Sequence, residues 1–157
     1  MVVQRFQAPI DGKLSAEMTA AYERDGVLVL EGMVPRRDCQ ALMRRAGELV
    51  EGFDTSESAT VFSTTTRSHD RDEYFRTSGG RIRFFLEEGA IAADGALNRE
   101  KSQCINKVGH ALHDLDPVFD AFSRDRRLSA VAQSIGCARP LLLQSMYIFK
   151  QPNIGGE

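Results

Sequence analysis

The chain contains 157 residues, of which 42% are hydrophobic and 27% are charged, with 20 basic and 22 acidic side chains. This length and this apolar content are typical of one globular domain or of part of one, and they exclude a chain that is disordered throughout. The net charge of −2 provides no basic surplus to neutralise phosphates, so we expect no nucleic-acid partner. No apolar run is long enough to cross a bilayer, so we expect no membrane partner.

The cysteines and the N-terminal residues bear on the cellular compartment. Cys39, Cys104 and Cys137 are an odd number of cysteines, far apart and without a C-x-x-C motif. This usage is typical of reduced thiols in an intracellular protein rather than of a disulfide framework. No apolar stretch of signal-peptide length precedes Pro9. We therefore predict a cytoplasmic protein.

The first half of the chain predicts two helices separated by a short strand. Residues 14–26 have a capping serine, Ser15, and a glycine, Gly26, at the position where helices end. Residues 27–30 are an apolar, β-prone run. Pro35 then opens a helix whose apolar side chains recur at spacings of three and four. These side chains are Cys39, Leu42, Met43, Ala46, Leu49, Val50 and Phe53.

A polar segment and a hairpin are predicted next. Residues 54–72 are rich in serine and threonine and have little periodicity, which is typical of a surface loop. The turn residues 78–80 lie between Tyr74-Phe75 and the run 81–86. Because Gly-Gly between β-prone runs favours a tight turn, we predict a β-hairpin here, with Ile82, Phe84 and Leu86 on one face.

From residue 102 the spacing of apolar side chains predicts helices again. Ile105, Val108, Leu112 and Leu115 are three or four residues apart, which predicts a helix over 102–115. Asp116-Pro117 is a capped start for a short following helix. Residues 128–136 form a further apolar stripe that ends at a glycine.

The last run, residues 141–150, predicts a strand that is apolar on both faces and therefore central in a sheet. A central strand needs neighbours on both sides to pair its backbone groups, and the sequence ends seven residues later. We therefore expect the chain to be incomplete. The fold class predicted from the whole pattern is α+β: a helical layer and a hairpin, followed by the first strand of a sheet.

Two groups of side chains are candidates for chemistry. His110 and His113 are three residues apart on the predicted helix, and with Asp116 they could bind zinc or iron. The alternative is that one histidine packs in the core while the other is solvated. Glu87 and Glu88 are adjacent, so they point to opposite sides of a strand, and we interpret them as part of a solvated turn.

Lys107 is a third candidate because it lies in a mostly apolar segment, three residues before His110. An ammonium at the edge of a core can bind a carboxylate through charge-assisted hydrogen bonds. The alternative is a lysine that extends to solvent from the edge of a helix. Spacing by itself leaves both interpretations open.

Four collinear stretches resemble the phytanoyl-CoA dioxygenase family. They are ERDGVLVLEGMV at 23–34, GGRIRFFLEEGA at 79–90, INKVGHALHDLDPVF at 105–119 and QSMYIFKQPNIGGE at 144–157. Their order and spacing match over nearly the whole chain, and the match is weakest over residues 55–72.

The resemblance implies a fold and a chemistry. Members of the family form a jelly-roll barrel (double-stranded β-helix) with a helical layer packed outside it. They use Fe(II), 2-oxoglutarate and oxygen to hydroxylate a substrate, with the iron held by an H-x-D…H triad. The resemblance also implies 2-oxoglutarate contacts at Lys107, in the INKVGH match, and at Met146, in the SMYIF match.

The chain departs from the family pattern at its end. In relatives the H-x-D pair follows the GGE by a few residues, whereas this chain ends at Glu157. We therefore expect residues 1–157 to be the N-terminal portion of a single domain, truncated before the metal motif. This portion would contain an incomplete barrel, retain neither iron nor 2-oxoglutarate, and be inactive by itself.

Two functions follow as expectations. The first is part of an Fe(II)- and 2-oxoglutarate-dependent dioxygenase acting on a small-molecule or acyl substrate. The second is a non-catalytic truncated isoform or helical module that binds a partner through the apolar surface its missing barrel would cover. In either case the strand over 141–150 would have an exposed apolar edge, so we also expect self-association through that edge.

Overall fold

The protein is described by a computed structural model that covers residues 3–55, 60–61 and 73–154. Helices and strands are mixed along these ranges, which confirms the α+β class. The strands are β1 Arg5–Gln7, β2 Val29–Glu31, β3 Thr60–Val61, β4 Ile82–Leu86, β5 Ile105–His110 and β6 Ser145–Ile148. The helices are α1 Ala16–Asp25, α2 Arg36–Gly52, α3 Glu73–Arg76, α4 Lys101–Cys104, α5 Leu112–Leu115, α6 Pro117–Ser123 and α7 Arg126–Ser134.

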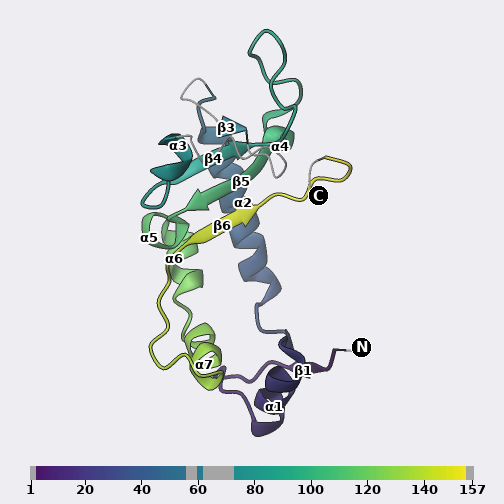
Figure 1. The fold of residues 1–157 in the computed structure, drawn as a ribbon, viewed down its shortest axis with the longest axis vertical. Helices are drawn as coiled ribbons and strands as arrows, with labels where there is room; N and C mark the ends of the chain where they lie inside the picture. The colour runs from purple at the N-terminus through teal and green to yellow at the C-terminus, as the bar shows by residue number, and fades with distance from the viewer. Residues whose placement is uncertain (1–2, 56–59, 62–72, 155–157) are drawn as a thin grey trace.

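A four-stranded sheet organises one end of the molecule (Figure 1). Its strand order is β3-β4-β5-β6, with β3 parallel to β4 and the other pairs antiparallel. The register places Phe84 opposite Val108 and Phe85 opposite Lys107 on β4 and β5. On the next pair of strands it places Lys107 opposite Ile148. Each strand thus contributes alternate side chains to the two faces of the sheet.

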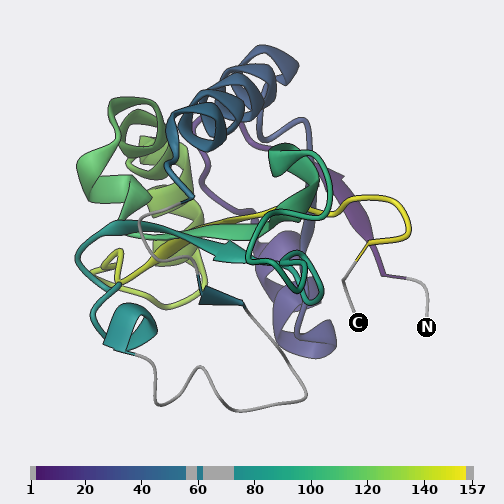
Figure 2. The same ribbon diagram turned by 90° about the horizontal axis from the view of Figure 1, so that it is seen from above.

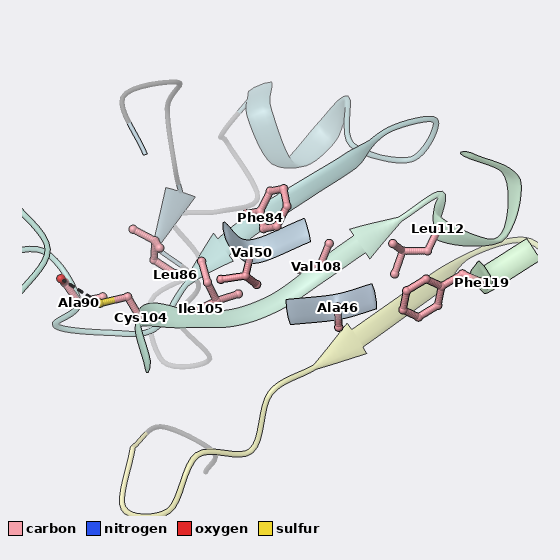
Figure 3. Close-up of a cluster of buried hydrophobic side chains, with 10 residues drawn as sticks. All are labelled: Ala46, Val50, Phe84, Leu86, Ala90, Cys104, Ile105, Val108, Leu112 and Phe119. Carbon is pink, nitrogen blue, oxygen red and sulfur yellow. Dashed lines mark hydrogen bonds between the residues drawn. The ribbon is translucent and has the colours of Figure 1, made fainter. Parts of the chain in front are cut away.

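The hydrophobic core lies between one face of this sheet and the long helix α2. Figure 2 shows α2 on one side of the sheet and the short helix α3 on the other. The close-up in Figure 3 shows β4 and β5 pointing side chains toward α2 and α6. The buried members of this core are Ala46, Val50, Phe84, Leu86, Ala90, Cys104, Ile105, Val108, Leu112 and Phe119.

A second group of elements lies at the opposite end of the molecule, where α1, α7 and the parallel pair β1-β2 come together (Figure 1). The backbone N–H of Leu14 donates to Ser134 Oγ at 3.2 Å, which links the segment before α1 to α7. Arg127 of α7 donates to the carbonyl of Met33 at 3.0 Å. These bonds tie the first 34 residues to a helix about a hundred residues later.

The predicted helix caps are confirmed. Ser15 Oγ accepts from the backbone N–H of Met18 at the start of α1, and Gly26 ends the helix with φ 70°. Asp116 caps α6 by accepting from the N–H groups of Val118 and Phe119. Within the described ranges, no helix combines the length and apolar character needed to cross a bilayer.

The helix predicted over 102–115 is wrong. It begins as the single turn α4, but residues 105–110 form strand β5, and α5 follows as a separate turn. A β-bulge explains the error. Leu86 pairs with Ile105 whereas Phe85 pairs with Lys107, so Asn106 is an extra residue in β5. The bulge lets Ile105 and Val108 both face the core although they are three residues apart, which imitates helical spacing.

The hairpin predicted around residues 78–80 is also wrong. Tyr74 and Phe75 belong to helix α3, and β4 pairs with β5 and β3 instead of with a preceding strand. The faces of β4 are as predicted, because Phe84 and Leu86 belong to the core and Ile82 packs against it. Tyr74, Phe75 and the glycine turn match the sequence pattern of a hairpin, but the folded chain forms a helix and a turn before β4.

The final strand is shorter and less central than predicted. It spans Ser145–Ile148 and occupies the edge of the sheet, with β5 as its only neighbour among the described residues. Leu141 and Leu143 precede it outside any strand, and both are exposed. The predicted loop over 54–72 lies largely outside the described residues, and its described part includes β3.

Candidate functional site

The face of the sheet opposite the core carries the candidate site. Because residues paired directly across strands share a face, the register puts one row of β4, β5 and β6 side chains together there. We call this surface the Lys107 face; its residues are Arg83, Phe85, Lys107, Met146 and Ile148. Helix α3 covers part of it, since the rings of Tyr74 and Phe75 both make edge contacts with Phe85.

Lys107 is buried in this face, with only 7% of its surface exposed. Its Nζ lies 5.2 Å from the ring centroid of Phe85 and 5.6 Å from that of Phe75, close enough for cation–π attraction. Burial lowers the pKa of the Lys107 ammonium, because the charged form loses hydration. The alternative of a lysine that extends to solvent from a helix edge is therefore wrong.

Met146 lies on the neighbouring strand and faces the same way. It is paired with Gly109, two residues along β5 from Lys107. A Cβ built on Gly109 would lie 3.0 Å from Met146 Cγ, which is tighter than an ordinary contact, so glycine lets the methionine pack closely across this strand. Met146 is 44% exposed at the open edge of the sheet. The structure thus brings Lys107 and Met146 to one face of adjacent strands.

His110 also contacts this site, at the end of β5. Its ring lies beside Phe85 and Phe75, at centroid distances of 5.4 and 5.8 Å. Its Nδ1 is 2.7 Å from Ser78 Oγ. Burial, and secondarily the positive charge of Lys107, lower the pKa of the His110 imidazole. Both effects favour the neutral form of the imidazole.

The alternative metal site at His110, His113 and Asp116 is wrong, because the three side chains have different partners. His113 Nδ1 is 2.8 Å from Ser145 Oγ. Asp116 accepts from Arg45 Nε at 2.6 Å. Across residues 3–55, 60–61 and 73–154, no three His, Cys, Asp or Glu side chains are grouped so that they could hold a metal ion.

Glu87 and the cysteines are the remaining candidates from the sequence. The prediction that Glu87 and Glu88 are solvated is wrong for Glu87, which is only 3% exposed just after β4, and is confirmed for Glu88, which is exposed. Cys39 and Cys137 are exposed and Cys104 is buried, and all three are free thiols. Cys104 lies in the core near the carbonyl of Ala90 (Figure 3).

Sequence reasoning missed the residues that surround Lys107. Phe75 and Ser78 were interpreted only as parts of a hairpin, and Phe85 only as a strand residue on the other face. Gly109 carried a usable signal, because glycine inside a β-prone run often marks a close approach of another chain segment. The placement of the other three depends on the pairing of β4 with β5, which no local pattern specifies.

A buried ammonium in an aromatic and apolar face is suited to binding one carboxylate of a small anion. Comparison with known proteins identifies the family of the chain. The sequence profile of the phytanoyl-CoA dioxygenase (PhyH) family matches residues 22–157. The chain belongs to the phytanoyl-CoA dioxygenase family. The resemblance predicted from the four sequence stretches is therefore confirmed.

The curated relatives of this family member are similar over almost all of this chain. "Phytanoyl-CoA dioxygenase" of Arabidopsis thaliana is 44% identical over 148 residues, which cover 94% of this chain and 52% of the relative. "Phytanoyl-CoA dioxygenase domain-containing protein 1" of Bos taurus is 41% identical over 149 residues, which cover 92% of this chain and 51% of the relative. The chain spans about half the length of the curated relatives it matches.

Proposed function

We propose that residues 1–157 are the N-terminal portion of a single phytanoyl-CoA dioxygenase-like domain. The complete protein is proposed to be an Fe(II)- and 2-oxoglutarate-dependent dioxygenase that hydroxylates a small-molecule or acyl substrate. The observation that carries the proposal is that Lys107 and Met146 share one face of adjacent strands in a member of this family. Their positions are the ones that the family resemblance implies for 2-oxoglutarate contacts.

The chain's own residues have distinct parts in this proposal. Lys107 Nζ donates to a carboxylate of 2-oxoglutarate, in a site where Phe75 and Phe85 exclude water and so strengthen the interaction. Met146 supplies an apolar wall for the same molecule. When bound, Fe(II) with 2-oxoglutarate supplies the oxidising chemistry that hydroxylates a C–H bond.

The iron ligands are proposed to lie on the part of the family domain that this chain does not span. Two observations support this: the chain matches about half of each relative, and β6 has a free edge among the described residues. In the proposal, further strands pair with that edge and complete the jelly-roll barrel. The chain by itself is then inactive and retains neither iron nor 2-oxoglutarate, because metal binding needs all of its ligands.

Succinate formation tests the enzymatic part of the proposal. The complete protein is incubated with Fe(II), 2-oxoglutarate and oxygen, and this chain is assayed beside it. We expect succinate from the complete protein and only the background rate from this chain. Turnover by the chain alone would contradict its proposed inactivity, and no turnover by the complete protein on any acyl or small-molecule substrate would count against the dioxygenase.

A binding measurement tests the assignment of Lys107. Lys107→Ala in the complete protein should weaken 2-oxoglutarate binding by about tenfold or more, since it removes a charge-assisted hydrogen bond. Lys13→Ala is the matched control, because Lys13 is an exposed lysine next to α1 at the far end of the molecule. Equal affinities of the two variants would remove Lys107 from the site.

The second candidate function is a non-catalytic, cytoplasmic module that binds a partner or a second copy of itself. The observation that favours it is an exposed apolar run before and within β6, where Leu143 is 85% exposed. Leu143→Lys should then reduce self-association of this chain, measured by light scattering against concentration. Ile10→Lys is the control because Ile10 is 98% exposed but lies far along the chain. Equal effects of both substitutions would reject association through this edge.

A further inference from the structure

His110 is a buried basic group that the proposed function leaves without a role. Only 7% of its surface is exposed, and its Nδ1 is bonded to Ser78 Oγ. Its other ring nitrogen, Nε2, has no hydrogen-bond partner among the described residues. Buried polar atoms almost always have a partner, so an unpaired one in a candidate site points to a ligand or a bound water.

The hydrogen bonds of Ser78 fix the tautomer of His110. Ser78 Oγ lies 2.5 Å from the backbone carbonyl oxygen of Phe75. A carbonyl oxygen only accepts, so the single hydroxyl hydrogen of Ser78 is donated to it. Ser78 Oγ must then accept at its other contact, the one of 2.7 Å with His110 Nδ1. Nδ1 therefore carries the proton, and in the neutral ring Nε2 has the free lone pair.

The unpaired Nε2 belongs to the same small site as the ammonium of Lys107. The His110 ring and Lys107 Nζ each lie within 6 Å of the ring centroids of both Phe75 and Phe85. Although the register pairs His110 with Ile82 and Ser145, its ring and the Lys107 ammonium therefore share the same two aromatic neighbours.

The other charged groups near His110 come from the elements packed around it. From β4, the Arg83 guanidinium lies 4.3 Å from the ring centroid of Tyr74 and donates to Thr77. Helix α3 contributes Tyr74 together with the exposed Glu73 and Arg76. His113 of α5 is bonded to Ser145, and β6 carries no titratable side chain apart from Tyr147 on its other face.

We propose that His110 takes up a proton at Nε2 when 2-oxoglutarate binds beside Lys107, so that the bound carboxylate meets two cationic donors. This inference rests on the proposed function, which places 2-oxoglutarate at Lys107. Without ligand, burial and the neighbouring ammonium both disfavour an imidazolium. A carboxylate at Lys107 reverses the electrostatic part of that penalty and offers an acceptor for the Nε2 hydrogen. The proton comes from solvent, and no covalent bond to carbon changes.

Proton uptake on binding is the direct test. Anaerobic calorimetric titration of the complete, Fe(II)-loaded protein with 2-oxoglutarate is run near pH 6.5 in two buffers of different ionisation enthalpy. We expect a net uptake of roughly half a proton or more per 2-oxoglutarate bound, and affinity about three- to tenfold tighter near pH 6 than near pH 8. Both carboxyl groups of the ligand stay ionised over this range, so the proton is taken up by the protein.

Two histidine substitutions assign the proton to His110. His110→Asn keeps an N–H at the position of Nδ1 for Ser78 and removes the ring nitrogen Nε2. It should abolish proton uptake near pH 6.5 and lower the affinity near pH 6 to about the value near pH 8. His113→Asn is the matched control, since His113 is a buried histidine three residues along that bonds Ser145 instead. It should leave the uptake unchanged.

The outcomes separate this inference from the function on which it rests. Tight 2-oxoglutarate binding by the unsubstituted protein without proton uptake would overturn the role of His110 and leave the dioxygenase proposal standing. Uptake that persists in His110→Asn or disappears in His113→Asn would also overturn it. Absence of any 2-oxoglutarate binding would overturn both proposals. If His110→Asn does not fold, His110→Gln, which also lacks a titratable ring, is titrated in its place, and the same outcomes decide.

Discussion

Arg45 of α2 and Asp116, at the start of α6, form an ion pair in which Nε of the partly exposed Arg45 lies 2.6 Å from Oδ2 of the buried Asp116. The Asp116 side chain is only 1% exposed, and its Oδ1 also accepts from the N–H groups of Val118 and Phe119. One carboxylate therefore caps α6 and fixes it against α2, the helix that covers the core.

Asp116→Ala should lower the free energy of unfolding by about 2 kcal/mol, since it removes a helix cap and one of the two carboxylate partners of Arg45. Asp116→Asn retains a capping oxygen and should cost less. Asp120→Ala is the control, because the Asp120–Arg124 pair is exposed and worth little. The three variants are compared by urea denaturation. Equal losses for Asp116→Ala and Asp120→Ala would contradict the assigned role.

Lys107→Met should weaken 2-oxoglutarate binding by the complete protein about tenfold or more, because methionine keeps an apolar side chain of similar length beside Phe75 and Phe85 but removes the ammonium. Calorimetric titration with 2-oxoglutarate measures the affinity. Lys13→Met, at an exposed position, should change the affinity little. An unchanged affinity in Lys107→Met would contradict a contact between Lys107 and the ligand.

Acid should destabilise the protein in part through His110. Burial and Lys107 lower its folded-state pKa below the ordinary value of 6.5. Below about pH 6.5 the unfolded state therefore binds a proton more readily than the folded state, and the free energy of unfolding falls. One such group changes the free energy of unfolding by at most about 1.4 kcal/mol per pH unit. Urea denaturation at several pH values should show a shallower acid slope for His110→Asn, and an unchanged slope would mean that His110 is not a source of the acid sensitivity.

Gly109→Ala should destabilise the β5-β6 pair. The added methyl group would lie 3.0 Å from Met146 Cγ and 3.2 Å from the carbonyl oxygen of Ser145, so the Met146 side chain and the backbone at Ser145 must shift by a few tenths of an ångström. We expect a loss of about 1–3 kcal/mol in the free energy of unfolding and weaker 2-oxoglutarate binding by the complete protein. Gly47→Ala, inside α2 with no atom within 4 Å of the added Cβ, should instead stabilise by about 0.5–1 kcal/mol. A neutral Gly109→Ala would mean that β6 adapts freely.

Local sequence patterns predicted the parts of the fold that local interactions stabilise. Ser15 and Gly26 bound α1, and Asp116 caps α6, because capping bonds reach only two to four residues along the chain. The stripe after Pro35 predicted α2 and its buried residues Ala46 and Val50. In the same stripe Met43 and Cys39 are exposed, because the sheet covers a narrower strip of the helix than the apolar residues span.

The sequence by itself therefore determined the α+β class, the ends of α1, the cap of α6 and the family. The family resemblance also proposed two candidate site residues, Lys107 and Met146. Only the tertiary structure decided that Lys107 lies on a strand, between Phe75 and Phe85 and on the same face as Met146. The bulge at Asn106 gave β5 an apolar spacing that a helix shares, so periodicity could not distinguish the two. Strand pairing and register depend on contacts between segments far apart in the chain. The spacing of side chains within one segment therefore cannot predict them.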